Sequence, residues 1–250
     1  MPPRGGSPIR PRRRRKRRWL RNAFLFLVLV LLIVVAWEAW TWPDVAALTS
    51  RNPSTTAFIE RYRSQQRAAR RDDRVQRAWV PYTAIAPSVK RAVLVAEDIN
   101  FFSHRGFDLG EIRIAVTRAI EDGEAPRGAS TITQQLAKNL WLSPSRSPFR
   151  KLEEAILTWQ LERTLTKRRI LELYLNVVEL GPGVYGIEAA SRRYFDKPAS
   201  AVAEDEAAEL AASLPSPGTW HPGSTRPGYR RHVESIKRRM TKATFLAGQI

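Results

Sequence analysis

The chain has 250 residues, no cysteine, and 42 basic against 24 acidic side chains, which gives a formal net charge of +18. This length suits one well-buried domain with an anchor, and two large domains would be crowded. The absence of cysteine excludes a disulfide framework, a thiol nucleophile and a thiolate metal site, and it is compatible with an oxidising exterior.

Much of the positive charge lies at the start of the chain. Ten of the 42 basic residues fall within the first 21 positions, and the remainder has 32 basic against 24 acidic residues, a net charge of +8. A nucleic-acid partner for the folded part therefore loses most of its support. The rest of the chain is moderately basic, which suits an anionic ligand or a lipid surface.

An apolar segment follows this basic tail. Residues 23–37 form an uninterrupted apolar run of 15, and counting on to Trp42 past Glu38 gives 20 residues. As a helix of about 1.5 Å rise per residue, they span about 30 Å, the thickness of a bilayer core. The flanking tryptophans resemble interfacial belts, and the basic cluster favours a cytoplasmic N-terminus. We predict a cytoplasmic polybasic tail over residues 1–22 and a transmembrane anchor over residues 23–42.

Two export signals compete with a retained anchor. A cleaved signal peptide suits the short apolar core, but bulky Trp37, Trp40 and Trp42 stand where a cleavage site needs small residues. The arginine-rich start also leaves a folded-export address open. The retained anchor is the favoured interpretation.

Residues 43–80 predict a linker and a juxtamembrane helix. Prolines mark a linker over residues 43–53, and a polar helix with few apolar contacts follows from Ser54 to about Arg71. Its arginines either contact anionic headgroups or simply face water. Residues 79–85, which include Pro81, predict an extended segment and not a central strand.

From Ser88 onward the chain predicts consecutive helices with short breaks. Apolar residues recur at i, i+3, i+4 and i+7 from Val89, Ile112, Leu152 and Ala207, which is the period of an amphipathic helix. No alternating strand ladder is visible, and glycines at 181, 183 and 186 predict a turn whose backbone approaches a ligand. We expect a mainly α domain over residues 81–240, which ends in a basic helix, and a C-terminal tail over residues 241–250.

The stretch from residue 128 to 139 is the most informative, because its polar positions are nearly all hydroxyls and amides. Ser130 or Thr131 can cap a helix start there, and Thr131 with Gln134 fits a capping box. One helix face then combines donor-rich side chains that suit a polyhydroxylated or phosphorylated ligand: Thr131, Gln135, Lys138 and Asn139. A capped helix whose polar face meets water is an equal alternative.

Two acids stand out by their neighbours. Glu97 lies at the margin of an apolar stripe, and partial burial raises the pKa of a carboxyl group, which suits a general base. Glu154 shares a helix edge with Arg150 and Lys151, which an ordinary intrahelical ion pair would also explain. Taken alone, each acid is more often structural than catalytic. His104 alone more often orients a neighbour or fills a core than acts as a base.

Taken together, these segments resemble, in order, the motifs of the family-51 peptidoglycan glycosyltransferases over about residues 53–240. The matching segments are Glu97-Asp98-x-x-Phe101-x-x-His104-x-Gly106, Gly128-x-Ser130-Thr131-Ile132-x-Gln134-Gln135-x-x-Lys138-Asn139, Arg150-Lys151-x-x-Glu154, Lys167-x-x-Ile170-Leu171-x-x-Tyr174-Leu175-Asn176 and Glu206-Ala207-Ala208-x-Leu210-Ala211. The resemblance implies a mainly α, lysozyme-like helical glycosyltransferase domain behind one N-terminal transmembrane helix.

The resemblance also implies a reaction and a location. Members of this family polymerise lipid II into linear glycan strands on the outer face of the inner membrane, with inversion at the donor anomeric carbon and release of undecaprenyl pyrophosphate. The chain would be a single-pass protein of the inner membrane with a periplasmic catalytic domain. Its partners would be lipid II, the growing lipid-linked glycan, the membrane, and proteins of cell-wall synthesis or division. The sequence requires no cofactor and predicts no metal ligands, although a divalent cation, Mg or Mn, assists some members at the pyrophosphate.

Residue by residue, the motif match assigns expected roles. Glu97 resembles the base that deprotonates the acceptor hydroxyl, and Glu154 resembles the second catalytic acid, on the donor side. Lys138, Arg150 and Lys151 would meet the pyrophosphate, where fixed cations stabilise the charge of the leaving group. The expected substrate-binding residues are Asp98, Phe101, His104, Ser130, Thr131, Gln134, Gln135, Lys138, Asn139, Arg150 and Lys151.

Other classes are weaker. A lysozyme-like or lytic enzyme that cleaves glycan strands is the closest alternative, but cleavage of a neutral glycosidic bond has no use for three cations around a diphosphate. A non-enzymatic membrane scaffold predicts that removal of Glu97 changes nothing measurable. A penicillin-binding transpeptidase is excluded, because the sequence contains no Ser-x-x-Lys and only 35 residues follow Pro215.

Overall fold

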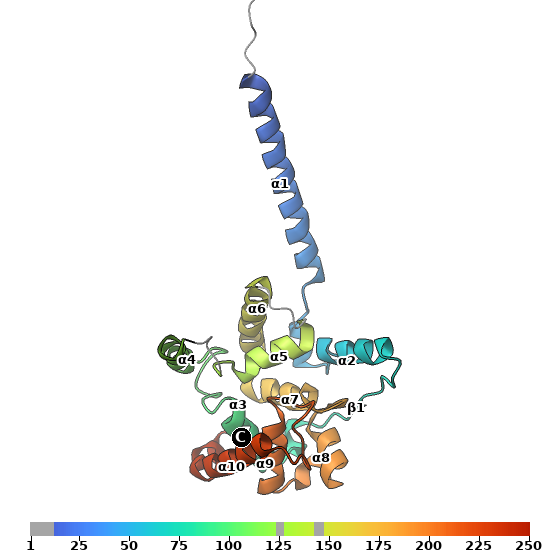
Figure 1. The fold of residues 1–250 in the computed structure, drawn as a ribbon, viewed down its shortest axis with the longest axis vertical. Helices are drawn as coiled ribbons and strands as arrows, with labels where there is room; N and C mark the ends of the chain where they lie inside the picture. Colours follow the sequence, from blue (N-terminus) through green and yellow to red (C-terminus); the bar gives the residue numbers. More distant parts are fainter. Residues whose placement is uncertain (1–12, 124–127, 143–147) are drawn as a thin grey trace, which may run out of the picture. The chain divides into compact units, whose positions relative to one another are not determined.

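The computed structural model describes residues 13–123, 128–142 and 148–250. The chain divides into two compact units, residues 1–44 and residues 45–250. The described residues are mainly helical, as the sequence predicts (Figure 1).

The first unit contains the helix α1 (Arg13–Thr41), which covers nearly all of the predicted anchor. Apolar side chains on it, among them Phe24, Phe26 and Leu27, are exposed. Within the residues that the structure describes, no helix combines the length and the apolar character that a membrane crossing requires. The predicted anchor is therefore unconfirmed. The first 12 residues of the predicted polybasic tail lie outside the described residues.

The second unit is built from helices joined by short segments. Its elements in chain order are η1 (Ala46–Thr49), α2 (Ala57–Ala68), β1 (Gln76–Arg77), η2 (Tyr82–Ala84), α3 (Pro87–Glu97), α4 (Leu109–Asp122), α5 (Ile132–Trp141), α6 (Pro148–Thr164), α7 (Lys167–Val177), β2 (Glu179–Gly181), β3 (Val184–Tyr185), α8 (Ile187–Phe195), η3 (Ala199–Ala201), α9 (Glu204–Ser213), α10 (Pro227–Lys242) and η4 (Thr244–Gly248). The helices predicted from Ser88 onward are confirmed. The polar helix predicted before them is confirmed as α2. The segment predicted as extended over residues 79–85 contains the single turn η2.

Two groups of helices make the core. In the first, α3, α9 and α10 pack against one another, and small alanines on α9, such as Ala207 and Ala211, are completely buried and allow close approach. In the second, α5 packs against α2, α6 and α7. The last residue of α3 is Glu97. Its carboxylate therefore belongs to the first group of helices and contacts α5 of the second group.

A small sheet was not expected from the sequence. Strand β3 pairs in parallel with β1 and antiparallel with β2. Strands of two or three residues are too short to show an alternating pattern, which is why the prediction of no ladder was wrong here.

The glycine turn beside this sheet packs against the protein's own tyrosines. A Cβ on Gly181 would lie 1.9 Å from Tyr194 Oη, and one on Gly183, at φ +72°, would lie 2.7 Å from Tyr62 Oη. Close backbone approach is therefore real at this turn, and the neighbours of Gly181 and Gly183 are tyrosine side chains of the same domain.

Helices α4 and α6 leave large apolar side chains uncovered. On α4, Leu109 and Ile120 are 76 % and 77 % exposed, and on α6, Leu152 and Trp159 are 60 % and 53 % exposed. The apolar period of these two segments correctly predicts helices, but much of the apolar surface does not enter the core. Contiguous exposed apolar side chains of this kind are typical of surfaces that contact another molecule or a membrane.

Candidate active site

Glu97 stands at the junction of the two helix groups. Its half-buried carboxylate accepts a hydrogen bond from Gln135 Nε2 on α5, at 2.6 Å from Glu97 Oε2. The hydroxyl of Tyr174 on α7 donates to Gln135 Oε1 at 2.9 Å, and Tyr174 is completely buried. Tyr174 thereby fixes the orientation of the Gln135 amide, which points its NH₂ group at Glu97.

Burial raises the pKa of Glu97 above its ordinary value. The hydrogen bond from Gln135 and the charges of Lys138 and Arg239 lower this pKa, but they do not offset the loss of solvation. The neighbouring Asp98 raises it further. A carboxylate with a raised pKa is a stronger proton acceptor, and this supports the prediction that Glu97 acts as a base.

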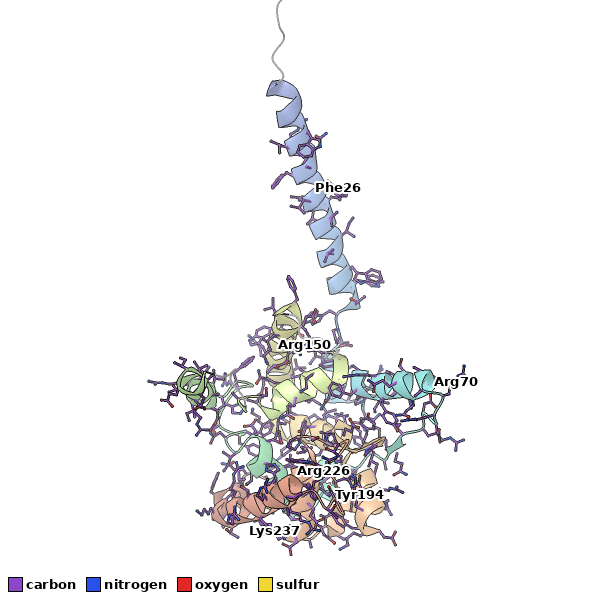
Figure 2. The ribbon with its side chains drawn as sticks, in the orientation of Figure 1. Phe26, Arg70, Arg150, Tyr194, Arg226 and Lys237 are labelled. Atoms are coloured by element: carbon purple, nitrogen blue, oxygen red, sulfur yellow. The ribbon has the colours of Figure 1, made fainter. Side chains whose placement is uncertain are left out.

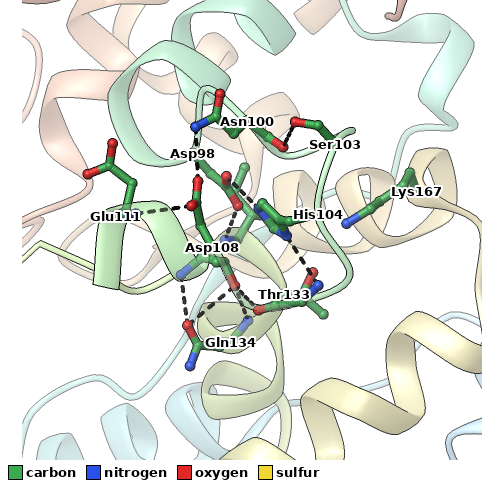
Figure 3. A network of polar contacts seen from close by, with 12 residues as sticks. Asp98, Asn100, Ser103, His104, Asp108, Glu111, Thr133, Gln134 and Lys167 are labelled. Atoms are coloured by element: carbon green, nitrogen blue, oxygen red, sulfur yellow. Dashed lines mark hydrogen bonds and ion pairs between the residues drawn. The ribbon is translucent and has the colours of Figure 1, made fainter. Parts of the chain in front are cut away.

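Asp98 anchors the first motif to the start of α5 (Figure 3). Its Oδ2 accepts from the backbone N–H of Ile132 at 3.0 Å, and its Oδ1 lies 2.9 Å from His104 Nε2. Because Gly106 N–H donates to His104 Nδ1 at 3.2 Å, the ring proton sits on Nε2 and is donated to Asp98. Asp98 is buried and both its oxygens are engaged. Its carboxylate at a helix N-terminus is also favoured by the helix dipole.

The capping box predicted at the start of α5 is confirmed. Thr131 Oγ1 accepts from the N–H of Gln134 at 3.3 Å, and Gln134 Oε1 accepts from the N–H of Thr131 at 3.0 Å. The Thr131 hydroxyl also donates to the carbonyl of Gly106 at 2.7 Å. Of the two candidate caps it is Thr131, and not Ser130, that caps the helix.

Gly106 holds the loop close to α6. Its φ is +88°, and a Cβ there would lie 2.7 Å from Thr158 Cγ2. Only glycine adopts this backbone without strain. The loop between α3 and α4 is therefore fixed at Asp98, His104 and Gly106 against two different helices.

Lys138 lies one helical turn after Gln135, and charged groups from two other helices act on it. It is half-buried, and burial lowers its pKa, as do the positive charges of Arg150 and Lys151. The carboxylates of Glu154 and Glu97 raise the same pKa. Among the described residues, no hydrogen bond or ion pair engages the side-chain ammonium of Lys138.

Glu154 is buried on α6 and pairs with both neighbouring cations. Arg150 Nη1 lies 2.9 Å from Glu154 Oε2, and Lys151 Nζ contacts Glu154 Oε1. The sequence suggests either a plain intrahelical ion pair or a catalytic acid. The structure contains the ion pair, and a role for Glu154 in the reaction stays a prediction.

An open cavity of about 220 Å³ lies beside Glu97. The predicted site residues Glu97, Asp98, Ser130 and Thr131 line it. The cavity is therefore lined by separate parts of the chain, among them the end of α3, the loop after it, the segment before α5 and the helix α10.

Several predicted substrate-binding residues are deeply buried: Phe101, Thr131, Gln134 and Asn139. Phe101 is fully covered and carries the ammonium of Lys167 over its ring at 4.3 Å. Gln135 and Lys138 are half-buried. The start of α5 is therefore not a simple solvated face, and which of these side chains contact a substrate stays a prediction.

Sequence reasoning missed some residues of the site. Asn100, Asp108, Glu111 and Arg239 also line the cavity. Asp108 caps α4 by accepting from the backbone N–H of Glu111 at 3.0 Å, and nothing in the local sequence shows that these two residues lie at the cavity beside Glu97. Arg239 was only one of several basic residues in a terminal helix, and nothing local distinguishes it.

The chain is similar to known proteins of one family. Residues 63–241 match the family model described as transglycosylase. A biosynthetic peptidoglycan transglycosylase of Azoarcus sp. strain BH72 is 44 % identical over 90 % of this chain and 96 % of its own length. Proteins of the same description from Thiobacillus denitrificans and Nitrosospira multiformis are 44 % and 39 % identical, over 89 % and 92 % of this chain and 95 % and 98 % of their own lengths.

The domain is helical, and it places the half-buried carboxylate of Glu97 beside α5, the helix that carries Lys138. With the family match over most of its folded length, the chain belongs to the transglycosylase family and is a glycosyltransferase.

Proposed function

We propose that this protein polymerises lipid II into linear glycan strands of peptidoglycan, with inversion at the donor anomeric carbon and release of undecaprenyl pyrophosphate. The relatives' description as biosynthetic peptidoglycan transglycosylases supports the substrate class. The lysozyme-like character of the domain belongs to the same proposal.

One observation carries the proposal: Lys138 interacts electrostatically with Glu97 and also with the group Arg150, Lys151 and Glu154. The half-buried ammonium of Lys138 therefore lies under the influence of the proposed proton acceptor, Glu97, and of the basic residues on α6. Transfer of a sugar from a diphosphate needs these two functions at adjacent places.

In the proposed reaction, the 4-hydroxyl oxygen of the acceptor sugar forms a bond to the anomeric carbon of the donor. The bond from that carbon to the diphosphate oxygen breaks, and the proton of the hydroxyl passes to Glu97. Gln135 donates one hydrogen bond to Glu97 Oε2, and the carboxylate keeps further acceptor positions for the hydroxyl. Lys138, Arg150 and Lys151 stabilise the negative charge on the departing diphosphate.

Cleavage of glycan strands is the alternative function. A hydrolase acting on a neutral glycosidic bond would develop no diphosphate charge. The half-buried ammonium of Lys138 would then lose solvation with no ligand to compensate for it. This cost favours synthesis over cleavage.

A divalent cation such as Mg or Mn fits the proposal only if the diphosphate itself coordinates it. Within the described residues, no group of three or more His, Asp or Glu side chains is placed to hold a metal ion. Diphosphate oxygens are suitable ligands for such an ion. The residues Lys138, Arg150 and Lys151 would share the charge neutralisation with it.

We further propose that residues 23–42 anchor the protein in the inner membrane, with a cytoplasmic N-terminus and a periplasmic domain. The apolar run, its flanking tryptophans and the basic tail support this in the sequence. An anchor concentrates the enzyme where lipid-linked substrates lie. Proteins of cell-wall synthesis or division are the expected protein partners.

The test is to incubate detergent-solubilised full-length protein with purified lipid II and to follow glycan length by gel electrophoresis. Wild type is expected to form long strands. Glu97→Gln is expected to lose at least about a hundredfold in turnover, because the proton acceptor is removed. Glu234→Gln, an exposed acid on α10, serves as the matched control and should retain full activity.

Two outcomes would overturn the proposal. If wild type shortened existing glycan and formed no polymer, the function would be cleavage. If Glu97→Gln polymerised as fast as wild type with an unchanged melting temperature, Glu97 would not be the base.

A further inference from the structure

The cavity beside Glu97 has an uneven distribution of charge. Four of its lining residues are acids, namely Glu97, Asp98, Asp108 and Glu111. Arg239 is the one Lys or Arg among the described residues that line it. An anionic ligand would be repelled by most of this lining and would need Arg239 to enter.

The packing of α10 places Arg239 at this cavity. Tyr229, Val233, Ile236 and Met240 are buried at intervals of four, three and four residues, and they fix this face of α10 against α3 and α9. Arg239 precedes the last of them, near the end of the helix. Its charge acts on Glu97, whose pKa it helps to lower.

Arg239 has no structural task that would explain its position. It is exposed, and in the described part of the chain no hydrogen bond or ion pair joins it to another side chain. Lys237, two residues earlier, instead pairs with Asp205 at 2.9 Å. Five donors of the Arg239 guanidinium are therefore available to a ligand.

The proposed reaction has two lipid-linked substrates, and each has a diphosphate. The group of Lys138, Arg150 and Lys151 serves one of them, and none of these three residues lines the cavity. Arg239 does line it. Lys138 on α5 and Arg239 on α10 thus act on Glu97 from different helices.

We infer that Arg239 is a binding residue for the acceptor and that it holds the acceptor's phosphate group at the cavity beside Glu97. This inference rests on the proposed function. The planar guanidinium suits a phosphate with two parallel hydrogen bonds. In this position it also offsets the acidic lining, so that the acceptor hydroxyl reaches Glu97.

The experiment separates the acceptor from the donor. Lipid II with its terminal 4-hydroxyl blocked serves as a labelled donor that cannot accept, and unblocked lipid II is varied as the acceptor. A second acceptor has the same disaccharide on an uncharged lipid ether. The full-length wild type, Arg239→Ala and the control Arg238→Ala are compared, since Arg238 is also exposed but does not line the cavity.

Arg239→Ala is expected to raise KM for the lipid II acceptor about tenfold to hundredfold, as loss of a charged hydrogen bond does. KM for the blocked donor and for the uncharged acceptor should stay within about twofold of wild type, and Arg238→Ala should match wild type throughout. Melting temperatures confirm that the variants fold.

An unchanged acceptor KM in Arg239→Ala, or an equal rise for the uncharged acceptor, would overturn the inference while leaving the proposed function intact. A rise in the donor KM alone would move Arg239 to the donor side and overturn it as well. Failure of wild type to join any donor to any acceptor would instead overturn the proposed function, and the inference with it.

Discussion

At the scale of single residues, Lys138 has the most demanding position. It is half-buried on α5, its pKa is lowered first by burial, and the two acids that raise this pKa come from α3 and α6. An ammonium in such a place loses solvation without a fixed hydrogen-bonding partner among the described residues. The proposed diphosphate would compensate for this loss of solvation, because its oxygens would accept hydrogen bonds from the Lys138 ammonium during the reaction.

Substitution of Lys138 by Met should therefore separate activity from stability. Turnover of lipid II is expected to fall about a hundredfold to a thousandfold, as when one preorganised donor to a developing charge is removed. The melting temperature should stay the same or rise, because a desolvated charge is lost. Lys242→Met, at an exposed lysine of α10, is the control for a general loss of charge. Equal activity of Lys138→Met and wild type would remove Lys138 from the site.

At the scale of elements, local signals in the sequence predict the helices well and the sheet poorly. The capping box of α5 and the cap of α4 by Asp108 follow from a few adjacent residues, so they can be predicted without a tertiary structure. The β2–β3 hairpin is too short for such a signal, and Glu179 at its start acquires its environment only when the hairpin packs. Burial raises the pKa of Glu179 to about 7, opposed by the charge of Arg61.

The raised pKa of Glu179 in strand β2 predicts that the stability of the protein depends on pH. The native protein keeps a proton on Glu179 that an unfolded chain releases near pH 4.5, so the free energy of unfolding should fall as pH rises from about 4.5 to 7. Glu179→Gln removes this dependence. The variant should melt at a higher temperature than wild type at pH 8, with a smaller difference at pH 4, as measured by circular dichroism. Equal melting curves at pH 8 would contradict a buried, neutral Glu179.

At the scale of the whole domain, the exposed apolar side chains form a pattern that the helix period does not reveal. Figure 2 shows side chains projecting from helices of the second unit. On α6, Leu152, Ile156 and Trp159 are exposed at intervals of four and three residues, which places them on one face. The lipid-linked substrate proposed above would bring the enzyme to a membrane surface, and this face of α6 is suited to lie in such a surface.

The absence of cysteine makes this testable in the full-length protein. Leu152→Cys, labelled with an environment-sensitive fluorophore in reconstituted vesicles, should show a blue-shifted emission that brominated lipids quench. The same label at Arg193→Cys, an exposed position of α8, should show neither effect. Equal quenching at the two positions, or none at either, would exclude a membrane contact by this face of α6.

The sequence by itself determined the helical class, the capping box of α5, the partial burial of Glu97 and the family, because these depend on neighbours along the chain or on long motifs. It did not reveal that Asp98 is held by His104 and Ile132, that Tyr174 orients Gln135, or that Arg239 shares a cavity with Glu97. Those contacts join residues up to 142 positions apart. Only the packing of α3 against α10, and of α5 against α6 and α7, brings these groups together, because the charge and burial of a side chain depend on its neighbours in space.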